Sequence, residues 1–495
     1  MDLLYKSTRG AGIKATASQA ILKGLADDGG LFVPEQIPKL EMDIEALAKM
    51  NYQETAYVVM KQFLTDFTET ELKSCITKAY DEKFDTEVIA PIKAAADNHY
   101  LELFHGATIA FKDMALSILP HLLITAAKKN QVQNEIVILA ATSGDTGKAA
   151  LAGFADVQGT RIVVFYPENG VSPIQEKQMV TQTGDNTMVV GVKGNFDDTQ
   201  TGVKNIFGDK AFAAELEQVG FQFSSANSIN IGRLVPQIVY YVYAYAQMFK
   251  NGEIKAGEEL NVVVPTGNFG NILAAYYAKE MGLPLGKLIC ASNDNKVLYD
   301  FFTTGTYDRN REFILTSSPS MDILISSNLE RLIYKIADSD ATKNAELMEA
   351  LNQKGKYEIT PKMKEQLADF YGAYAMEEEI ASEIKEVYET SGYVLDTHTA
   401  VASKVYRQYQ KETADKRKAV IVSTASPYKF ARNVMEAIDT KYAQQDEFEL
   451  IEQLTKVSKV TEPQAITEIR TAPILHETVV EVSDMKNTVK QFLKI

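Results

Sequence analysis

A single lysine, Lys112, stands in a largely apolar stretch, residues 101–113, just after the glycine-bearing turn at Gly106 and at the expected start of a helix. A lysine amine is a poor nucleophile while it is protonated. Partial burial disfavours the ammonium form and lowers the pKa of the amine, which can then form a Schiff base with an aldehyde. The alternative is that Lys112, followed by Asp113, belongs to a solvated helix face. Lys112 is the candidate reacting residue, and its partners must come from elsewhere in the chain.

The loop after the apolar run at 135–140 predicts an anion site at the start of a helix. It reads Ala141-Thr142-Ser143-Gly144-Asp145-Thr146-Gly147-Lys148. Small residues between a strand and a helix let backbone N–H groups face a carboxylate or a phosphate. A nucleotide-binding P-loop is excluded, because Thr142 stands where the first glycine is required and Ala149 where a serine or threonine should follow the lysine. A plain helix cap by Ser143 or Asp145 is the alternative.

A second loop follows the run at 260–264 and contains Gly267-Asn268-Phe269-Gly270-Asn271. Its glycines can expose a row of amides to a phosphate, and the two asparagines add side-chain donors. The glycine spacing does not match the dinucleotide-binding fingerprint. A tight turn without a ligand is the alternative.

A third loop follows the run at 419–422. Ser426 and Pro427 suit the cap and the first position of a helix, which accounts for both without any function. Thr424 is left at the carboxyl end of a strand, where open α/β sheets bind ligands. Its hydroxyl is placed to meet a ring nitrogen.

The elements that must position these loops alternate between short β-branched runs and helical patterns. One series of strands is expected at 135–140, 161–166 and 187–192, with helices near 146–156 and 173–183, and a second series at 260–264, 287–291 and 419–422. This alternation predicts an α/β fold with two open, mainly parallel α/β domains and a cleft between them.

The expected domains are a small, mainly helical N-terminal unit at 1–95, a smaller α/β domain at 96–230 and a larger one at 231–495. Residues 335–415 are polar and helical in period, and they carry the acidic run Glu377-Glu378-Glu379. We expect them to form an insertion of surface helices in the larger domain.

The composition excludes some binding partners and indicates the compartment in which the protein is expected. The chain has 495 residues and a net charge of −15, so no basic field is available to hold nucleic acid or an anionic membrane. Cys75 and Cys290 are expected to be free thiols in a reducing compartment, and no apolar run reaches the length of a membrane span. We therefore expect a cytoplasmic protein. His105 and His398 lack metal-ligand spacing, and no metal site is predicted.

Together, a Schiff-base lysine, a phosphate-binding glycine loop and a hydroxyl for a pyridine nitrogen suit pyridoxal phosphate. The chain resembles the threonine synthases, a family of fold-type-II pyridoxal-phosphate enzymes, over most of its length. The resemblance rests on segments spread along the chain: Ser7-Thr8-Arg9-Gly10, residues 25–35, Phe111-Lys112-Asp113, Ser143-Gly144-Asp145-Thr146-Gly147, Gly267-Asn268-Phe269-Gly270-Asn271, Ser318-Pro319-Ser320-Met321-Asp322 and Asp396-Thr397-His398-Thr399-Ala400.

The resemblance implies a role for each loop. Lys112 would hold the cofactor, Gly267, Asn268, Phe269, Gly270 and Asn271 would bind its phosphate, and Thr424 would meet its ring nitrogen. Ser143, Gly144, Asp145 and Thr146 would receive the substrate carboxylate. Asn230 and Arg233 resemble ligands of the substrate phosphate, since a guanidinium can grip phosphate at two places. An arginine paired with an acidic neighbour is the alternative for Arg233. Many similar proteins carry a histidine where Ser426 stands, and some an aromatic residue in place of Ile231.

The activity implied by the resemblance is conversion of O-phospho-L-homoserine and water to L-threonine and phosphate, by γ-elimination and β-addition of water, with Lys112 as the base. A serine or threonine dehydratase, or another β-replacement enzyme, would use the same cofactor architecture. A catalytically silent relative that only binds ligands is the alternative outside enzymes. For assembly we expect a monomer or a homodimer.

Overall fold

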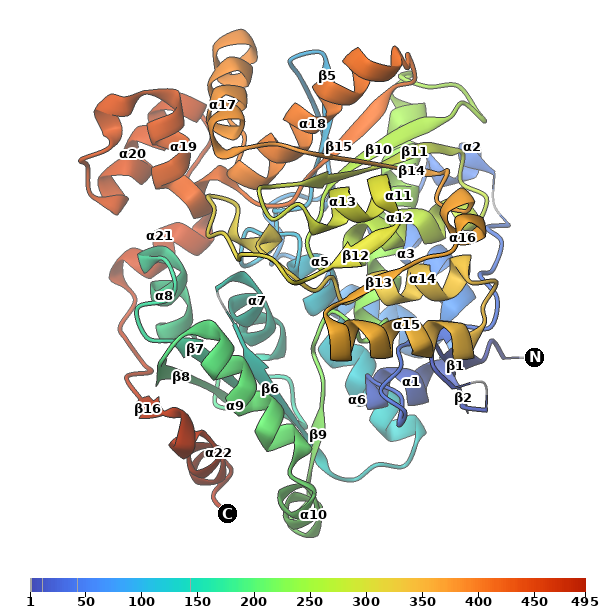
Figure 1. Ribbon diagram of the computed structural model, residues 1–495. Helices are drawn as coiled ribbons and strands as arrows, with labels where there is room; N and C mark the ends of the chain where they lie inside the picture. The colour runs from blue at the N-terminus through green and yellow to red at the C-terminus, as the bar shows by residue number, and fades with distance from the viewer. Residues whose placement is uncertain (1, 11, 42, 143) are drawn as a thin grey trace.

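The computed structural model describes residues 2–10, 12–41, 43–142 and 144–495, and two open sheets dominate it (Figure 1). The larger sheet has the strand order β14-β11-β10-β15-β5-β4, and the smaller one β16-β8-β7-β6-β9. All neighbouring strands in both sheets are parallel except the hairpin of β4 and β5. The predicted α/β class with two mainly parallel sheets is therefore confirmed.

The six strands predicted from apolar runs all form within two residues of the expected bounds. A run that is buried on both faces is typical of a parallel strand, and every residue of β10 is buried. The larger sheet consists of β4 (Ile92–Ala95), β5 (Asn98–Glu102), β10 (Leu260–Pro265), β11 (Leu285–Ser292), β14 (Phe370–Tyr374) and β15 (Ala419–Ser423). The smaller sheet consists of β6 (Glu135–Ala141), β7 (Thr160–Pro167), β8 (Thr187–Lys193), β9 (Phe221–Ser224) and β16 (Val479–Glu481).

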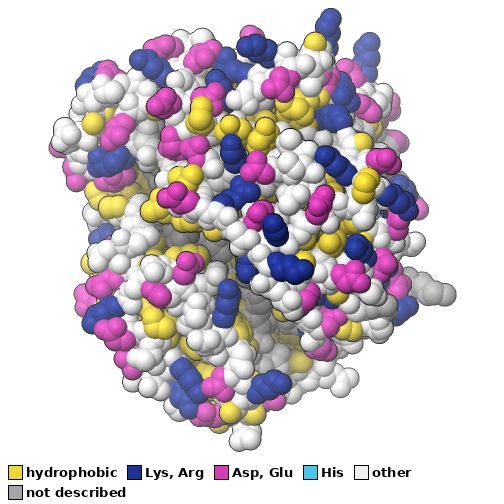
Figure 2. Space-filling model, in the orientation of Figure 1, with side chains coloured by type: hydrophobic (Ala, Val, Ile, Leu, Met, Phe, Trp, Pro, Cys, Tyr) yellow, Lys and Arg dark blue, Asp and Glu magenta, His cyan; other side chains and the backbone are white. Residues whose placement is uncertain are grey.

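The sheets divide the molecule into two lobes, with a hollow between them on the face drawn in Figure 2. Helices of the smaller lobe are α7 (Asp145–Phe154), α8 (Pro173–Val180), α9 (Phe196–Gly208), α10 (Lys210–Gln218) and α22 (Met485–Leu493). Helices of the larger lobe are α11 (Ile231–Lys250), α12 (Gly270–Glu280), α13 (Val297–Thr304), α14 (Leu329–Ile336), α15 (Ala341–Lys354), α16 (Pro361–Glu365), α17 (Glu377–Ser391), α18 (Thr397–Thr413), α19 (Ala431–Ile438) and α20 (Glu447–Ser458). Helix α21 (Gln464–Thr471) contacts α8.

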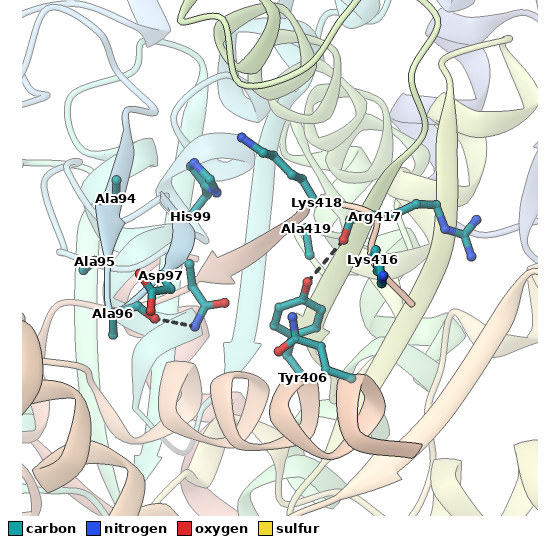
Figure 3. A pocket seen from close by; sticks show the side chains of 12 residues that line it. Ala94, Ala95, Ala96, Asp97, His99, Tyr406, Lys416, Arg417, Lys418 and Ala419 are labelled. Atoms are coloured by element: carbon teal, nitrogen blue, oxygen red, sulfur yellow. Dashed lines mark hydrogen bonds between the residues drawn. The ribbon is translucent and has the colours of Figure 1, made fainter. Parts of the chain in front are cut away.

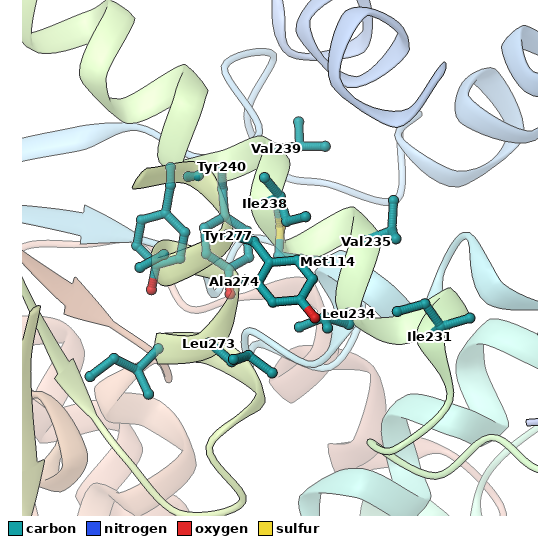
Figure 4. Close-up of a cluster of buried hydrophobic side chains, with 14 of the residues drawn as sticks. Met114, Ile231, Leu234, Val235, Ile238, Val239, Tyr240, Leu273, Ala274 and Tyr277 are labelled. Carbon is teal, nitrogen blue, oxygen red and sulfur yellow. The ribbon is translucent and has the colours of Figure 1, made fainter. Parts of the chain in front are cut away.

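The N-terminal residues share their core with the larger lobe. They form α1 (Ala17–Lys23), α2 (Ile44–Leu47), α3 (Tyr52–Phe63), α4 (Glu69–Ala79) and a small sheet of β1 (Tyr5–Ser7), β2 (Lys14–Ala15) and β3 (Phe32–Pro34). Helices α1, α2 and α3 contact α11, which is buried along nearly all of its length. Figure 4 shows this core, where side chains of α11 meet Met114, Leu273 and Tyr277. A helix that is apolar on all sides belongs inside a protein, and α11 forms the centre of the core.

Strand membership differs from the expected ranges in two places. Strands β4 and β5 join the larger sheet, and the C-terminal strand β16 returns to the smaller sheet by pairing with β8. The chain thus crosses between the lobes more often than a contiguous division allows. We keep three domains as a proposal, with 92–102 assigned to the larger lobe and 479–493 to the smaller.

The expected surface insertion at 335–415 is wrong for two of its elements. Strand β14 forms the edge of the larger sheet, and α18 packs against β10, β11, β14 and β15. The pattern misled because α18 buries polar side chains. The buried side chains of His398, Thr399 and Ser403 each form a hydrogen bond to another buried side chain. A polar sequence therefore does not indicate an exposed helix here.

Candidate active site

Lys112 lies between the ends of two neighbouring parallel strands. It directly precedes α5 (Asp113–Leu116), beyond the end of β5, while Thr424 follows β15. The amide of Phe111 donates to the carbonyl oxygen of Thr424 at 2.8 Å, and the amide of Ser426 donates to that of Ile109 at 3.0 Å. These two bonds fix the lysine segment and the third loop side by side at the carboxyl edge of the larger sheet, where α/β proteins bind ligands.

The amine of Lys112 is held inside the protein. Its side chain is 11% exposed, and Nζ donates to Ser320 Oγ at 3.2 Å and lies 3.7 Å from Asp145 Oδ2. Burial lowers the pKa of Lys112, and the positive charges of Lys429 and Arg233 lower it further, against the opposing effect of Asp145. A larger share of the amine is therefore neutral near pH 7 than for an exposed lysine, as a nucleophile or base requires.

Asp145 forms a buried ion pair in the same place. Its Oδ1 lies 3.1 Å from Nζ of Lys429, which is fully buried, and accepts a hydrogen bond from Gln175 Nε2 at 2.9 Å. Burial alone would raise the pKa of Asp145, but the charges of Lys429 and Lys112 outweigh it and hold the pKa well below its usual range. Asp145 is therefore an anion. An anionic side chain repels a substrate carboxylate, so Asp145 could contribute only its backbone N–H to the predicted contact, which stays a prediction.

The rest of that loop is tightly packed. Ser143 lies outside the described residues. Gly144 precedes α7 with φ of 141°, and a Cβ there would lie 2.4 Å from the side-chain nitrogen Nε2 of Gln175. Thr142 Oγ1 accepts the amides of Gly144 and Gly147, each at 2.9 Å. Binding of the substrate carboxylate by Gly144 and Thr146 stays a prediction.

The second loop is built as an anion cradle at the start of α12. Phe269 adopts a left-handed conformation, with φ of 64°, immediately before the helix. The carbonyl of Gly267 accepts Ser326 Oγ at 2.6 Å, and the carbonyl of Asn268 accepts the main-chain and side-chain nitrogens of Asn328, each at 3.0 Å. These bonds occupy both carbonyls, while the first N–H groups of α12 have no partner within the helix and can bind an anion.

Two unused polar groups fit the cofactor that the sequence predicts. Asn271 Oδ1 accepts the hydroxyls of Tyr240 and Tyr241, while its buried Nδ2 has no partner among the described residues. A buried donor without a partner is costly, and a bound phosphate would satisfy it. Thr424 is 6% exposed, and no hydrogen bond of its hydroxyl is seen within the described ranges. The segment of Lys112 pairs with Thr424, and Ser320 contacts both Lys112 and the backbone of Gly267. An amine, a row of amides and a hydroxyl are the groups that pyridoxal phosphate requires.

Asn230 and Arg233 differ in what they can offer a ligand. Asn230 caps α11: its Nδ2 donates to the carbonyls of Ile21 and Ser225, each at 2.9 Å, and its Oδ1 accepts the amide of Gly232. All its side-chain donors are in use, which favours a structural role over the predicted phosphate contact. Arg233 is 4% exposed and donates through Nη1 to the carbonyl of Ala226, while its Nε is buried without a partner among the described residues.

The guanidinium of Arg233 remains available for an anion. Burial lowers its pKa to about 10 with no contribution from any carboxylate. The acidic neighbour offered as the alternative at the sequence level is therefore absent from the described part of the chain. The positive charge of Arg233 is also one of those that lower the pKa of Lys112, which places it near the amine.

Ser320 and Lys429 belong to the site, and the sequence analysis assigned them no role. Ser320 lies in the motif Ser318-Pro319-Ser320-Met321-Asp322, and its hydroxyl donates to Asp145 Oδ2 at 3.1 Å. Its amide donates to His398 Nε2 at 3.1 Å, so His398 supports the site by a hydrogen bond. Lys429 lies two residues beyond Pro427, and its Nζ also donates to the carbonyl of Thr108 at 2.9 Å. The motif was visible in the sequence, but the contacts were not.

The remaining histidine singled out in the sequence is part of a salt bridge. His105 lies between Asp85, with 2.5 Å from Nδ1 to Oδ1, and Glu102, with 3.0 Å from Nε2 to Oε2. Burial opposes its protonation, but hydrogen bonds to Asp85 and Glu102 raise the pKa of His105 to about 9. Within the described ranges, no cluster of three or more His, Cys, Asp or Glu side chains could hold a metal ion.

A second hollow, of about 510 Å³, lies at the opposite end of the larger sheet (Figure 3). It is lined by residues 94–99 and 416–419 and by Tyr406 and Gln410, at the amino ends of β5 and β15. Lys112 and Thr424 follow the carboxyl ends of the same strands. This hollow is therefore separate from the candidate active site.

No described helix has both the length and the apolar character needed to cross a membrane.

Comparison with known proteins agrees with this geometry. Three family profiles match the chain: "Threonine synthase N terminus" over residues 4–80, "Pyridoxal-phosphate dependent enzyme" over residues 100–425 and "Threonine synthase, C-terminal" over residues 399–478. Threonine synthase-like 1 from Homo sapiens is 43% identical over 437 residues, which cover 86% of this chain and 58% of that protein. The chain thus spans less than two thirds of that relative's length.

Two further relatives match over nearly their whole length. Threonine synthase from Schizosaccharomyces pombe is 37% identical over 468 residues, covering 88% of this chain and 89% of that protein. The crystal structure of pyridoxal-phosphate-bound threonine synthase from Brucella melitensis covers 100% of both chains, with a TM-score of 0.85 and 33% identity. By sequence and by structure, this chain belongs to the threonine synthase family of pyridoxal-phosphate-dependent enzymes.

Proposed function

We propose that this chain converts O-phospho-L-homoserine and water to L-threonine and phosphate, with pyridoxal phosphate as its cofactor. The observation that carries the proposal is the buried amine of Lys112, which donates to Ser320. The backbone before Lys112 pairs with Thr424, and the carbonyl of Ser320 lies against Gly267 of the glycine loop at 267–271. Relatives of this chain that bear the name threonine synthase support the choice of reaction.

Lys112, the loop Gly267-Asn268-Phe269-Gly270-Asn271 and Thr424 would hold the cofactor. When bound, pyridoxal phosphate supplies an aldehyde that condenses with amines and a ring that spreads the negative charge left by loss of a proton. Thr424 offers the ring nitrogen a hydroxyl rather than a carboxylate. A hydroxyl leaves that nitrogen largely unprotonated, which moderates how far charge is drawn into the ring and favours elimination over transamination.

Lys112 would move the protons. Burial and two neighbouring cations lower the pKa of its Nζ, which favours the neutral amine that can accept the proton from Cα of the substrate. Loss of a second proton at Cβ would accompany departure of the γ-phosphate. Return of a proton at Cγ, addition of water at Cβ and return of a proton at Cα would then give threonine. The same Nζ would serve for successive transfers.

Arg233 would hold the phosphate of the substrate. Its guanidinium is buried, and among the described residues its Nε has no partner and no carboxylate faces it, so a phosphate would satisfy its donors and neutralise its charge. Asn230 would act through the helix cap that orients the first turn of α11.

The test is a visible absorbance spectrum of the purified protein together with product analysis. We expect a lysine-linked cofactor that borohydride bleaches, and release of phosphate and threonine from O-phospho-L-homoserine. Lys112→Ala should abolish both signals, while Lys93→Ala, at an exposed position of β4, should leave both unchanged. Activity on serine or threonine but not on the phosphorylated substrate would establish a dehydratase or a β-replacement enzyme instead. A bound cofactor without turnover of any of these would establish a silent relative.

We further propose a cytoplasmic location and a monomer or homodimer. Both cysteines, Cys75 and Cys290, are buried free thiols, as a reducing compartment allows. Cell fractionation and light scattering of the purified protein test the two statements.

A further inference from the structure

Within the described residues, the amine of Lys112 donates one hydrogen bond, and the hydroxyl of Ser320 accepts it. Ser320 lies in the short 3-10 helix η1 (Pro319–Met321) of the larger lobe. Its Oγ lies 3.2 Å from Lys112 Nζ and 3.1 Å from Asp145 Oδ2, so one hydroxyl lies between the amine and the carboxylate. The direct distance between Lys112 Nζ and Asp145 Oδ2 is 3.7 Å.

The direction of both hydrogen bonds follows from the charge of Asp145. An ionised carboxylate can only accept, so the hydroxyl of Ser320 must donate its proton to Asp145. The lone pairs of Ser320 Oγ are then left to accept an N–H of Lys112. The amine therefore has one defined N–H direction, and its free lone pair points elsewhere, as tetrahedral nitrogen requires.

Ser320 is itself held rigidly from behind. Its amide donates to His398 Nε2, and His398 Nδ1 lies 3.0 Å from Asp396 Oδ1. Because an amide only donates, Nε2 of His398 is the unprotonated nitrogen and Nδ1 carries the proton that Asp396 accepts. His398 and Asp396 are 2% and 1% exposed, so this support is closed to water. On its other side, the carbonyl of Ser320 lies 2.6 Å from where a Cβ of Gly267 would be.

We propose that Ser320 is a positioning residue that holds the Lys112 amine away from Asp145 and orients it for proton transfer. The inference rests on the proposed function for its consequence in turnover, but the contact itself does not depend on it. Without the hydroxyl, Lys112 can close the 3.7 Å gap and pair directly with Asp145. A directly paired amine is an ammonium ion and a poor base.

The other charged groups around Lys112 do not replace this role. Lys429 and Arg233 repel the ammonium form, and His398 reaches the amine only through Ser320. Burial and these two cations favour the neutral amine, and the opposing attraction depends on how closely Asp145 can approach.

The direct test measures Lys112 in the full-length chain before the cofactor is added. Acetic anhydride modifies neutral amines, and mass spectrometry of the Lys112 peptide gives the pH at which labelling is half-maximal. We expect Ser320→Ala to raise that midpoint by about one pH unit, the lower end of the effect of a close opposite charge. Ser320→Thr keeps a hydroxyl and should restore the wild-type midpoint. The double variant Ser320→Ala with Asp145→Asn should not show the rise, because no carboxylate remains to pair with the amine.

The holoenzyme gives a second readout. Ser320→Ala should lower kcat about tenfold at pH 7 with little change in KM, and the acidic limb of the kcat profile should move to higher pH by the same unit. Ser317→Ala, in the segment just before η1, is the matched control and should behave as wild type.

An unchanged labelling midpoint in Ser320→Ala, or equal effects of the alanine and threonine variants, would overturn the proposal. The labelling needs no turnover. A wild-type protein that makes no threonine would therefore refute the proposed reaction and leave this test of Ser320 intact.

Discussion

The buried pair of Lys429 and Asp145 makes a sharp prediction about stability. The nitrogen of Lys429 lies 3.1 Å from the carboxylate of Asp145, Lys429 is fully buried and Asp145 is 5% exposed. At an effective dielectric constant of about 20, two unit charges at that distance attract by about 5 kcal/mol. Replacing Lys429 by Met removes that attraction and leaves the carboxylate buried. Breaking a buried pair in this way costs about 3–5 kcal/mol.

We expect Lys429→Met to fall at the lower end of that range, about 3 kcal/mol, because Lys112 lies 3.7 Å from the same carboxylate and Gln175 still donates to it. Urea unfolding followed by tyrosine fluorescence measures the loss. In a double-mutant cycle with Asp145→Asn, the double variant should be more stable than the sum of the single losses predicts, by about 2 kcal/mol or more.

The matched control is a pair of the same type at the surface. Lys441 and Asp439 lie 2.8 Å apart and their side chains are 63% and 42% exposed. Lys441→Met should leave the free energy of unfolding nearly unchanged, because solvent screens the charges. If Lys429→Met costs no more than Lys441→Met, the reasoning about the buried pair is wrong.

Three further predictions concern the cofactor, the substrate and pH. Gly267→Ala should weaken pyridoxal phosphate binding at least about tenfold in a fluorescence titration, because the added Cβ would lie 2.6 Å from the carbonyl of Ser320 and the loop must move. Gly208→Ala, where a Cβ meets nothing within 4 Å, is the control, and equal affinities in the two variants would contradict the prediction. Arg233→Met should raise KM for O-phospho-L-homoserine about 10- to 100-fold and leave the cofactor spectrum unchanged, since it removes charged hydrogen bonds to phosphate; an unchanged KM would exclude the assigned role. His105→Asn should destabilise the protein by at most about 3 kcal/mol below pH 6.5, because the folded pKa of about 9 lies above the unfolded value. That difference should shrink as the pH rises and vanish above about 9, so a loss independent of pH would refute the charged pairing.

Several parts of the fold and site were predictable because they are local. Strands β6, β7, β8, β10, β11 and β15 are continuous apolar runs, and each lies within two residues of its predicted bounds. The cap of Ser426 on the 3-10 helix η2 (Pro427–Phe430) follows from two adjacent residues. In each case the signal lies within one turn or one strand of the residue concerned.

Other parts were not predictable because they depend on partners far away in the chain. Ser320 contacts residues 175 and 208 positions before it, and Lys429 reaches Thr108 across 321 positions. Helix α18 appeared to be a surface helix because its buried polar groups find their partners only in the folded protein.

The residue types and the strand ends that they follow can be read from the order of residues alone: a lysine after β5, glycines and asparagines after β10, and a threonine after β15. Their charge states and orientations, in contrast, depend on the folded chain. The pKa of Lys112 falls because the folded chain excludes water from the amine and brings Lys429 and Arg233 near it, and Asp145 stays ionised because Lys429 lies against it. Desolvation and Coulomb interactions depend on distance through space, which the order of residues does not contain.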